Sequence, residues 1–212
     1  MAERRGILIA LEGIDGSGKS TLQRALAEAL EQAGWVVTCS REPTAGKHGQ
    51  ALREAARVQR LPPERELELL LADRRDHVAQ TIAPALARGE AVILDRYYYS
   101  TAAYQGAAGL DPAELINVNE GFAPRPDLVV ILDLTPEQAL QRIAGRGEAT
   151  DEFERIDNLR RAREIFLGLE GQHFLVLDAA QPTSASAVAV IRRVEQGPGP
   201  RAWGPEKRDV LA

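Results

Sequence analysis

The sequence has few of the features that mark secreted or membrane-spanning proteins. It contains a single cysteine, Cys39, in 212 residues, which excludes a disulfide framework and a multi-cysteine metal centre and fits a reducing compartment. No apolar run approaches the ~18 residues that a membrane span needs, and the run before Glu12 is too short for a signal peptide. We therefore expect a cytoplasmic protein without membrane contacts.

Excess positive charge is also absent. Twenty-six basic residues stand against thirty-one acidic ones, which gives a net charge of −5. A protein that neutralises a nucleic-acid backbone over a broad face carries the opposite balance, so we expect no nucleic-acid partner, whereas a small anionic ligand is compatible with this charge. Hydrophobic residues make up 44% of the chain, which is typical of a globular protein with one sizeable core.

Short apolar runs alternate with helical patterns along the chain. The runs are rich in Val, Ile and Leu and are predicted to be strands buried on both faces; they cover residues 6–11, 35–39, 91–95, 128–134 and 173–178. The helical patterns cover 19–33, 63–88, 111–120, 136–144, 153–170 and 183–194. The alternation predicts an α/β fold with a parallel sheet and crossover helices. Cys39 ends an apolar run and is predicted to be a buried thiol rather than a nucleophile.

Domain organisation follows from the same pattern. Residues 1–195 are expected to form one domain without internal repeats. The segment 196–212 is rich in Gly and Pro and lacks periodicity, so we expect a mobile tail.

The strongest chemical signal lies between the first strand and the first helix. It is the octapeptide Gly13-Ile14-Asp15-Gly16-Ser17-Gly18-Lys19-Ser20, which matches the phosphate-binding pattern GxxxxGK[ST] and is followed by Thr21. Small residues let backbone N–H groups close around phosphate oxygens, the helix N-terminus adds a positive dipole, and Lys19 supplies a point charge. The hydroxyl of Ser20 is a candidate Mg²⁺ ligand.

A second signal, Asp95-Arg96, ends the strand 91–95. An open parallel sheet binds ligands beyond the carboxyl ends of its strands. Asp95 is therefore a candidate to hold Mg²⁺, directly or through water, or a cap of the following helix, and Arg96 is a candidate to grip a second phosphate.

Several motifs in order resemble the thymidylate kinase family over roughly residues 6–195. They are LEGIDGSGKST (11–21), REPT (41–44), ADR (72–74), DRYYYSTAAYQGA (95–107) and RPDLVVILDLTPEQAL (125–140). The resemblance implies a three-layer P-loop kinase fold, with a five-stranded parallel sheet flanked by helices and a short lid at about 142–153. It also implies a homodimer that transfers the γ-phosphoryl of Mg-ATP directly to dTMP, giving dTDP and ADP without a covalent intermediate. The cofactor is then Mg²⁺, and the nucleotide partners are ATP and dTMP.

The resemblance assigns the base-reading residues one by one. Arg74 matches an arginine that hydrogen-bonds the thymine carbonyl, and Ser100 and Gln105 match polar residues that face the base. Tyr104 matches a ring that crowds the sugar 2′ position and disfavours ribonucleotides. From the sequence alone, Tyr104 and Tyr97 to Tyr99 are half-buried helix aromatics.

The same resemblance assigns the acceptor phosphate and sugar. Asp15 matches an acidic residue that reaches the 3′-hydroxyl, although its residue type alone also suits a turn. Arg53 matches an arginine on the acceptor phosphate, and Arg41 opens the motif REP; the phosphate is then held by Arg96 with Arg41 or Arg53. From the sequence alone, the default for Arg41 and Arg53 is a solvated charge on a loop or helix.

Two positions depart from the family pattern. Leu70 stands where the family usually has a phenylalanine that stacks on the base, which predicts a loss of about 1 kcal/mol of stacking and relaxed base selectivity. The lid sequence Asp151-Glu152-Phe153-Glu154 lacks the usual basic residue. Because the P-loop carries no arginine either, Arg142 and Arg146 become the candidates that meet the charge of the transferred phosphoryl group.

Other charged residues receive no catalytic role. The arginines at 155, 160, 161 and 163 are predicted to form a solvated helix face; the alternative is that one of them contacts the acceptor phosphate. Arg75 is predicted to be an ordinary surface residue. His48, His77 and His173 lack partner spacing and are assigned neither a metal nor a catalysis role.

Two other functions stay open. A nucleoside monophosphate kinase of relaxed or different base specificity is the nearest alternative, which Leu70 favours and the pair Arg74 and Gln105 opposes. A non-catalytic nucleotide-binding switch is the second; it predicts nucleotide binding without phosphoryl transfer.

Overall fold

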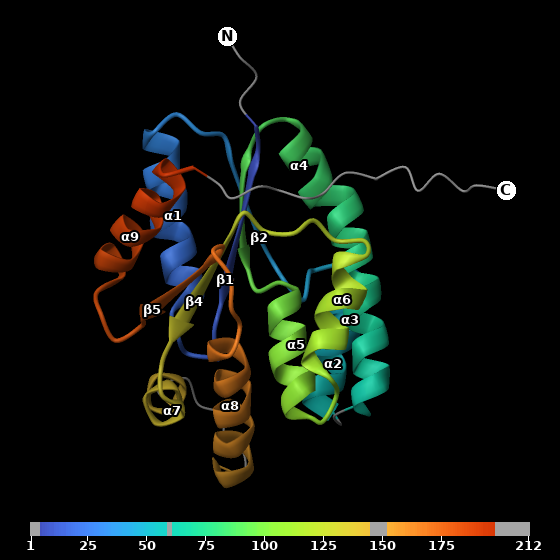
Figure 1. Cartoon of the computed structure of the whole chain (residues 1–212). Helices are drawn as coiled ribbons and strands as arrows, with labels where there is room; N and C mark the ends of the chain where they lie inside the picture. The colour runs from blue at the N-terminus through green and yellow to red at the C-terminus, as the bar shows by residue number, and fades with distance from the viewer. Residues whose placement is uncertain (1–4, 59–60, 145–151, 198–212) are drawn as a thin grey trace, which may run out of the picture.

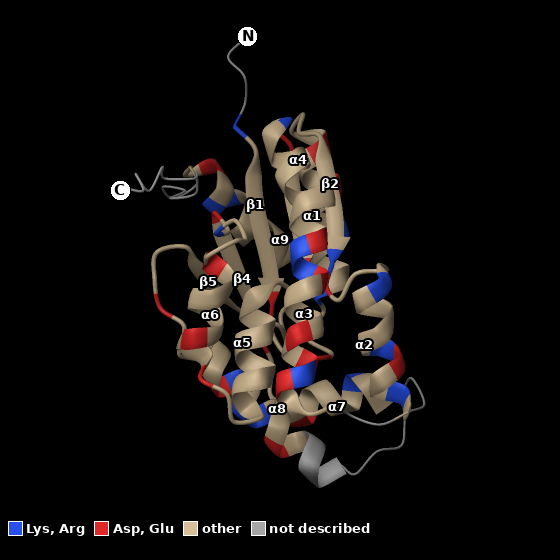
Figure 2. Cartoon of the chain, turned by 90° about the vertical axis from the view of Figure 1, so that its right-hand side faces the viewer, with Lys and Arg blue, Asp and Glu red and all other residues tan. Residues whose placement is uncertain are grey.

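The computed structural model describes residues 5–58, 61–144 and 152–197, with the backbone alone for 152–155. Within these ranges the chain forms three layers, in which a sheet seen nearly edge-on separates two groups of helices (Figure 1). None of the described helices is both long and apolar enough to cross a membrane. Seen from the side of α2 and α3, acidic and basic residues are interleaved rather than gathered into a face of one sign (Figure 2).

The sheet has five parallel strands in the order β2-β3-β1-β4-β5. Their bounds are Ile7–Glu12 (β1), Val37–Arg41 (β2), Ala91–Asp95 (β3), Leu128–Asp133 (β4) and Phe174–Asp178 (β5). All five lie where the sequence predicts them, to within two residues. The chain winds from β1 toward one edge and later crosses to β4 on the other side, so the strand order switches next to β1. A switch point of this kind leaves a crevice at the carboxyl ends of the strands.

The prediction that every strand is buried on both faces is correct only for the centre of the sheet. β1 and β3 are buried throughout, and β4 is buried except at its last residue, whereas β2 and β5 alternate between half-buried and exposed positions. These two are the edge strands, and an edge strand has a neighbour on one side only. Cys39 on β2 is therefore exposed rather than buried. Partial desolvation and the nearby Glu31 carboxylate raise the pKa of its thiol, which keeps it in the less reactive protonated form.

The helices cover both faces of the sheet. Their bounds are Lys19–Gln32 (α1), Lys47–Val58 (α2), Pro63–His77 (α3), Val78–Ile82 (the π-helical turn η1), Ala83–Ala87 (α4), Tyr98–Ala107 (α5), Pro112–Glu120 (α6), Pro136–Ala144 (α7), Glu152–Leu167 (α8) and Thr183–Glu195 (α9). α1 and α9 pack together on one face, and α3, α4, α5 and α6 lie on the other (Figure 1). The pattern at 63–88 thus corresponds to one helical run, α3-η1-α4, that a single π turn interrupts.

The helix α2 is absent from the predicted set, and α5 was predicted without bounds, as the helix that follows Asp95 and carries the tyrosines. α2 has the mostly polar sequence KHGQALREAARV, yet Leu52, Ala55 and Ala56 fall at helical spacing, so a helical signal was present and was missed. The first turn of α5 lies within the tyrosine run, and Tyr97, Tyr98 and Tyr99 are fully buried rather than half-buried. Each phenol finds a partner, as buried tyrosines generally do: Pro124 O for Tyr97, Glu120 for Tyr98, and His173 for Tyr99.

Candidate active site

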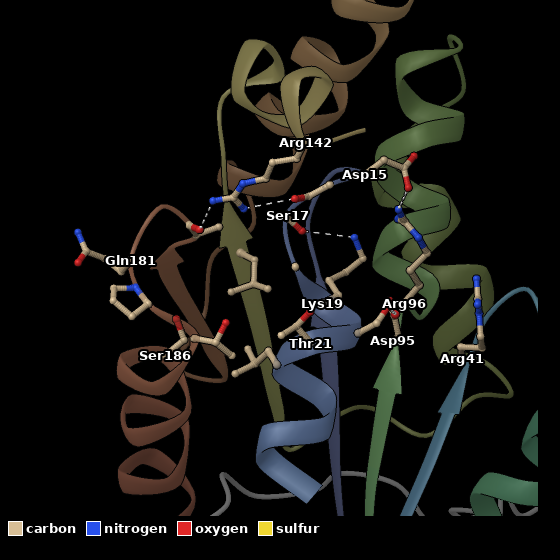
Figure 3. Close-up of a pocket in the computed structure, with 18 residues that line it drawn as sticks. Asp15, Ser17, Lys19, Thr21, Arg41, Asp95, Arg96, Arg142, Gln181 and Ser186 are labelled. Atoms are coloured by element: carbon tan, nitrogen blue, oxygen red, sulfur yellow. Dashed lines mark hydrogen bonds and ion pairs between the residues drawn. The ribbon is translucent and has the colours of Figure 1, made fainter. Parts of the chain in front are cut away.

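Two cavities open at the carboxyl edge of the sheet. The larger, of about 690 Å³, surrounds the P-loop and the start of α1, and Arg41, Arg142 and Gln181 lie on its rim (Figure 3). The smaller, of about 360 Å³, lies between α2, α3 and α5. Asp15 and Arg96 line both cavities, so these two side chains form a shared wall.

The P-loop joins β1 to α1 with a backbone that its glycines make possible. Gly13, Gly16 and Gly18 have φ values of 128°, 81° and 96°, a region that residues with a Cβ atom avoid. A Cβ on Gly13 would also stand 2.5 Å from Leu132 O. The loop therefore closes tightly over the sheet edge, and its residues from Asp15 onward line the larger cavity, as in phosphate-binding loops.

Lys19 is buried and folds back onto the loop that precedes it. Its Nζ donates to Gly13 O at 3.0 Å, to Ile14 O at 2.9 Å and to Ser17 Oγ at 3.4 Å. Desolvation, followed by the repulsion of Arg96, lowers the pKa of Lys19 to about 7. Because phosphate oxygens would replace these neutral acceptors with anionic ones, a bound polyphosphate restores the charge of this lysine.

Ser20 and Asp95 meet in the larger cavity, as the sequence predicts. Ser20 Oγ donates to Asp95 Oδ2 at 2.5 Å. A hydroxyl and a carboxylate supply the oxygen ligands that Mg²⁺ prefers, and Mg²⁺ usually completes its shell with water and substrate phosphates. This donor set, with only two protein oxygens beside a phosphate loop, fits a magnesium ion that arrives with a nucleotide.

Arg96 forms the centre of the shared wall. Its backbone has φ = 72°, which is strained for a residue with a side chain. Arg96 Nη2 donates to Asp15 Oδ1 at 2.7 Å and to Tyr104 Oη at 3.3 Å, and Nη1 donates to Ser100 Oγ at 3.0 Å. Although desolvation opposes the effect, the positive charges of Arg96 and Lys19 lower the pKa of Asp15. A fixed cation with an ionised partner thus stands between the cavities.

A buried polar cluster holds Arg74 at the wall of the smaller cavity. Arg74 donates from Nε and Nη2 to Glu42 Oε2 at 2.9 and 2.6 Å, from Nη1 to Asn119 Oδ1 at 2.6 Å, and from Nη2 to Thr101 Oγ1 at 3.0 Å. Despite desolvation, Arg74 and then His77 lower the pKa of Glu42. These contacts occupy four of the five guanidinium N–H groups, which leaves one Nη1–H for a ligand in this cavity.

Gln105 offers the complementary group. Its side chain is buried, and its Oε1 is the one buried side-chain polar atom of the described residues that lacks a hydrogen-bond partner. Gln105 lines the smaller cavity together with Leu70, Leu52 and Pro43. Buried acceptors without partners are costly and rare, so this carbonyl oxygen indicates a ligand that brings an N–H donor.

The remaining predicted site residues are distributed between the two cavities. Arg41 is exposed and lines the larger cavity, whereas Arg53 lines the smaller one and donates to Pro43 O at 3.1 Å. Arg142 donates to Gly16 O at 3.3 Å and to Ala179 O at 3.0 Å, which places it across the P-loop (Figure 3). Arg146 lies outside the described residues.

Ser100 and Tyr104 line the smaller cavity but are engaged with the shared wall. The Ser100 hydroxyl donates to Glu12 and accepts from Arg96, and Tyr104 Oη accepts from Asp15 N at 3.1 Å. The Tyr104 ring also lies 5.0 Å from the Arg96 guanidinium carbon. Both residues therefore support Arg96 in addition to facing the cavity.

Several residues predicted to be plain surface have specific partners. Arg163 forms a two-pronged ion pair with Asp133 at 2.6 and 2.9 Å, and Arg160 contacts Glu137, so these arginines tie α8 to β4 and α7 rather than facing only solvent. Arg161 is exposed, as predicted. Arg75 is exposed, yet it lies 3.9 Å from the centre of the Phe122 ring.

Four polar residues of the site were missed by the sequence reasoning. Glu42 and Asp73 lie inside quoted motifs, and Asp73 accepts hydrogen bonds from Thr44 and Gly49 that fix the start of α2. Glu12 also lies in a quoted motif. A charged residue directly after an apolar run was the available signal for Glu12, whereas Asn119 gives no signal in the sequence.

His77 was predicted to have no metal or catalytic role. It is buried between Glu42 Oε1 at 2.9 Å and Ser40 Oγ at 2.7 Å. It therefore contributes to the cluster around Arg74, and no group of three or more metal-ligating side chains of the His, Cys, Asp or Glu type occurs among the described residues.

Comparisons with known proteins agree with this geometry. A family model described as thymidylate kinase matches residues 11–189. The chain is 55% identical over 190 residues to a thymidylate kinase of Xanthomonas campestris pv. campestris (strain B100), covering 89% of this chain and 81% of the relative. It is 47% identical over 192 residues to a thymidylate kinase of Xylella fastidiosa (strain M12), covering 89% and 88%. With a family model that matches most of its length and relatives at this identity, the chain belongs to the thymidylate kinase family.

Proposed function

We propose that the chain performs the ATP-dependent phosphorylation of dTMP to dTDP at the wall that its two cavities share. The observation that carries this assignment is that Asp15 and Arg96 line both cavities. Two ligands that fill the cavities then meet at these residues, which is the arrangement that direct transfer between them requires. The family membership gives the reaction, and the residue roles below are our proposal.

The larger cavity takes the donor. The P-loop Gly13–Thr21 encloses the β- and γ-phosphates of ATP, with Lys19 exchanging its loop carbonyls for phosphate oxygens. Ser20 and Asp95 hold the Mg²⁺ ion, Asp95 directly or through water; when bound, this ion neutralises charge on the donor phosphates. Arg142 lies across the P-loop from these groups, where its guanidinium meets charge on the donor phosphates.

The smaller cavity takes dTMP. The unused N–H of Arg74 donates to a thymine carbonyl, and Gln105 Oε1 accepts from the thymine N3–H. Cytosine presents an acceptor at N3 and would leave Gln105 without a donor, which disfavours it. Leu70 packs against the base in place of an aromatic ring. Tyr104 and Asp15 lie beside the sugar.

The chemistry needs no strong base. The acceptor phosphate is already anionic near neutral pH, so the protein aligns the two phosphates and neutralises charge. Arg96 holds the acceptor phosphate, with Arg53 from the dTMP side and Arg41 from the ATP side. Arg146, in the lid at about 142–153, is a further candidate for the transferred group.

The coarser organisation follows the family. We propose a single kinase domain over residues 1–195 with a mobile tail at 196–212, acting in the cytoplasm as a homodimer. Nucleic acid is not a proposed partner.

A panel of acceptors tests this function. ADP release from Mg-ATP is measured with dTMP, dUMP, dCMP, dGMP and AMP in turn, for the wild type, Lys19→Ala and the matched control Lys47→Ala. Lys47 is exposed and lies in neither cavity lining. We expect a preference for dTMP that Lys19→Ala abolishes and Lys47→Ala retains. Comparable rates with dUMP or dCMP would indicate the relaxed base pocket that Leu70 suggests, and no acceptor-dependent ADP release would contradict the proposal.

A further inference from the structure

Glu12 is a buried carboxylate that the proposed mechanism does not use. It is the last residue of β1, it is 0% exposed, and it lines neither cavity. A carboxylate in such a position is costly unless its oxygens are hydrogen-bonded. The hydrogen-bond partners of Glu12 therefore indicate its structural role.

All hydrogen-bond partners that the structure gives the Glu12 side chain lie at the start of α5. Glu12 Oε1 accepts from Tyr97 N at 2.9 Å and from Ser100 N at 3.2 Å, and Oε2 accepts from Ser100 Oγ at 2.5 Å. The first amides of a helix lack the usual acceptor four residues back; Tyr97 N donates to Glu12, and Ser100 N is shared between Glu12 Oε1 and Tyr97 O at 3.1 Å. Tyr97, the residue that precedes α5, makes no capping hydrogen bond with its own side chain, so Glu12 caps the helix from β1.

Arg96 is connected to this cap both through the backbone and through side chains. Along the backbone, Arg96 directly precedes Tyr97 and has the strained φ of 72°, with its own N–H donating to Leu11 O at 2.9 Å. Through side chains, the Ser100 hydroxyl that donates to Glu12 also accepts from Arg96 Nη1 at 3.0 Å. Fixing Tyr97 and Ser100 therefore fixes both ends of Arg96.

We propose that Glu12 is a positioning residue that holds Arg96 in the shared wall of the two cavities. A strained backbone conformation persists only where surrounding contacts hold it in place. The hydrogen bonds from Glu12 on β1 are contacts of this kind for Arg96. The inference rests on the proposed role of Arg96 at the acceptor phosphate. Glu12 itself does not reach the substrates; it acts through Arg96.

An amide at position 12 cannot replace the carboxylate. In the variant Glu12→Gln, if the single amide oxygen accepts from the two α5 amides, the new NH₂ group faces Ser100 Oγ as a donor. The Ser100 hydroxyl would then receive donors from both this NH₂ group and Arg96, while its own hydrogen would lose its acceptor. The variant therefore keeps the shape of the side chain and disrupts the contact that orients Arg96.

A double-mutant cycle tests the proposal. The variants are Glu12→Gln, Ser100→Ala and the double variant, with steady-state kinetics for ATP and dTMP. For Glu12→Gln we expect kcat to fall at least tenfold and the KM for dTMP to rise, while the Kd of ATP alone changes less than twofold. The double variant should be no worse than Glu12→Gln, because both substitutions interrupt one chain of contacts. Additive losses, unchanged kinetics, or a matching loss of ATP affinity would overturn the proposal.

A matched control separates positioning from stability. Glu90 is a carboxylate of lower burial, 8% exposed, that accepts from Thr38 and Arg88 at the opposite end of the sheet. Glu90→Gln should leave kcat within twofold. If Glu12→Gln does not fold, Ser100→Ala carries the test, because it removes the side-chain connection between Glu12 and Arg96 and keeps the backbone connection. The Arg96 Nε–H signal should then shift in Ser100→Ala, and an unmoved signal together with wild-type kcat would overturn the proposal.

A spectroscopic readout is independent of the reaction. In ¹⁵N-labelled, ligand-free protein, the Nε–H signal of Arg96 should shift in Glu12→Gln, whereas that of Arg74, held by Glu42, should not move. If the wild type fails to phosphorylate dTMP, the proposed function is wrong, yet this shift still tests whether Glu12 positions Arg96. An unmoved Arg96 signal would contradict the positioning role.

Discussion

The two cavities of the site are built in different ways. Eight of the eighteen residues that line the larger cavity are consecutive, from Asp15 to Leu22. The smaller cavity draws on segments of α2, α3 and α5 and contains no more than two consecutive residues. A site made from one loop can be recognised in the sequence as a continuous motif. A site assembled from several helices leaves only separate short motifs, and the sequence does not show that they meet.

The cavities also differ in how their cations are held. Arg74 is fixed by Glu42, Asn119 and Thr101, none of which must move for its remaining N–H to meet a ligand. Lys19 is held by carbonyls of its own loop and must exchange them when phosphates bind. We infer that the dTMP side is preorganised and the ATP side adapts, and the predictions below test that difference.

The largest effect is expected on the donor side. Lys19→Ala removes the charge that meets the donor phosphates, and we expect kcat to fall about 10³-fold or more. Burial lowers the pKa of Lys19 to about 7, so its charge costs stability in the folded protein without ligand, and we expect the variant to unfold at no lower a free energy than the wild type. Steady-state ADP release and urea unfolding measure the two quantities. A variant with more than a tenth of wild-type kcat would contradict the role of Lys19.

The acceptor side should respond in stability as well as in activity. Glu42→Gln leaves the buried Arg74 guanidinium without its anionic partner, and we expect a loss of about 3 kcal/mol in the free energy of unfolding together with a raised KM for dTMP. Glu137→Gln is the control, because Glu137 pairs with Arg160 in an exposed position and should leave the free energy of unfolding almost unchanged. Equal losses in both variants would contradict a preorganised Arg74.

The free energy of unfolding should depend on pH through Glu12, the proposed support of Arg96. Burial raises the pKa of Glu12 to about 7 from 4.5, so between these values the folded protein binds more protons than the unfolded one. Stability then falls as the pH rises through this window. We expect the difference in unfolding free energy between wild type and Glu12→Gln to shrink by about 3 kcal/mol from pH 4.5 to 8. A difference that is constant with pH would refute this assignment.

Base selection should be sensitive to one atom. Gln105→Leu removes the unpaired acceptor in the dTMP cavity, and we expect kcat/KM for dTMP to fall 10- to 100-fold, which corresponds to about 2 kcal/mol. The ratio of dTMP to dCMP activity should fall as well, while the Kd of ATP is retained. An unchanged ratio would mean that Gln105 does not read the base.

The smallest effect concerns the position that departs from the family. Leu70→Phe restores an aromatic face at the smaller cavity, and we expect kcat/KM for dTMP to rise about fivefold, or about 1 kcal/mol. Competition between dTMP and dUMP is the measurement. A loss of activity would show instead that the cavity is already filled around Leu70.

The fold was predictable because its signals are local. The five strands appear as short Val-, Ile- and Leu-rich runs, and the P-loop appears as a continuous motif. The exposure of Cys39 was not predictable, since it depends on β2 lying at an edge, and strand order is not written in any one strand. α2 was missed although its few apolar residues share one helical face, because the prediction started from longer apolar patterns.

The candidate site was predictable to the extent that its residues lie in motifs. Asp95 and Ser20 were named and meet in the structure. The support of Arg74 by Asn119 joins residues 45 positions apart, and no spacing rule predicts such a pair. Glu12 was quoted within a motif, yet its role depends on α5, which packs beside it only in the folded chain.

The most direct test of a shared wall follows the transferred group itself. ATP labelled in its γ-phosphate is mixed with dTMP and Mg²⁺, and the label is counted in dTDP and in inorganic phosphate, for the wild type and for Arg96→Ala. We predict one labelled dTDP for each ADP formed by the wild type, and strongly reduced transfer in the variant. Label released mainly as inorganic phosphate, at a rate that does not depend on dTMP, would show that the two cavities do not exchange a phosphoryl group.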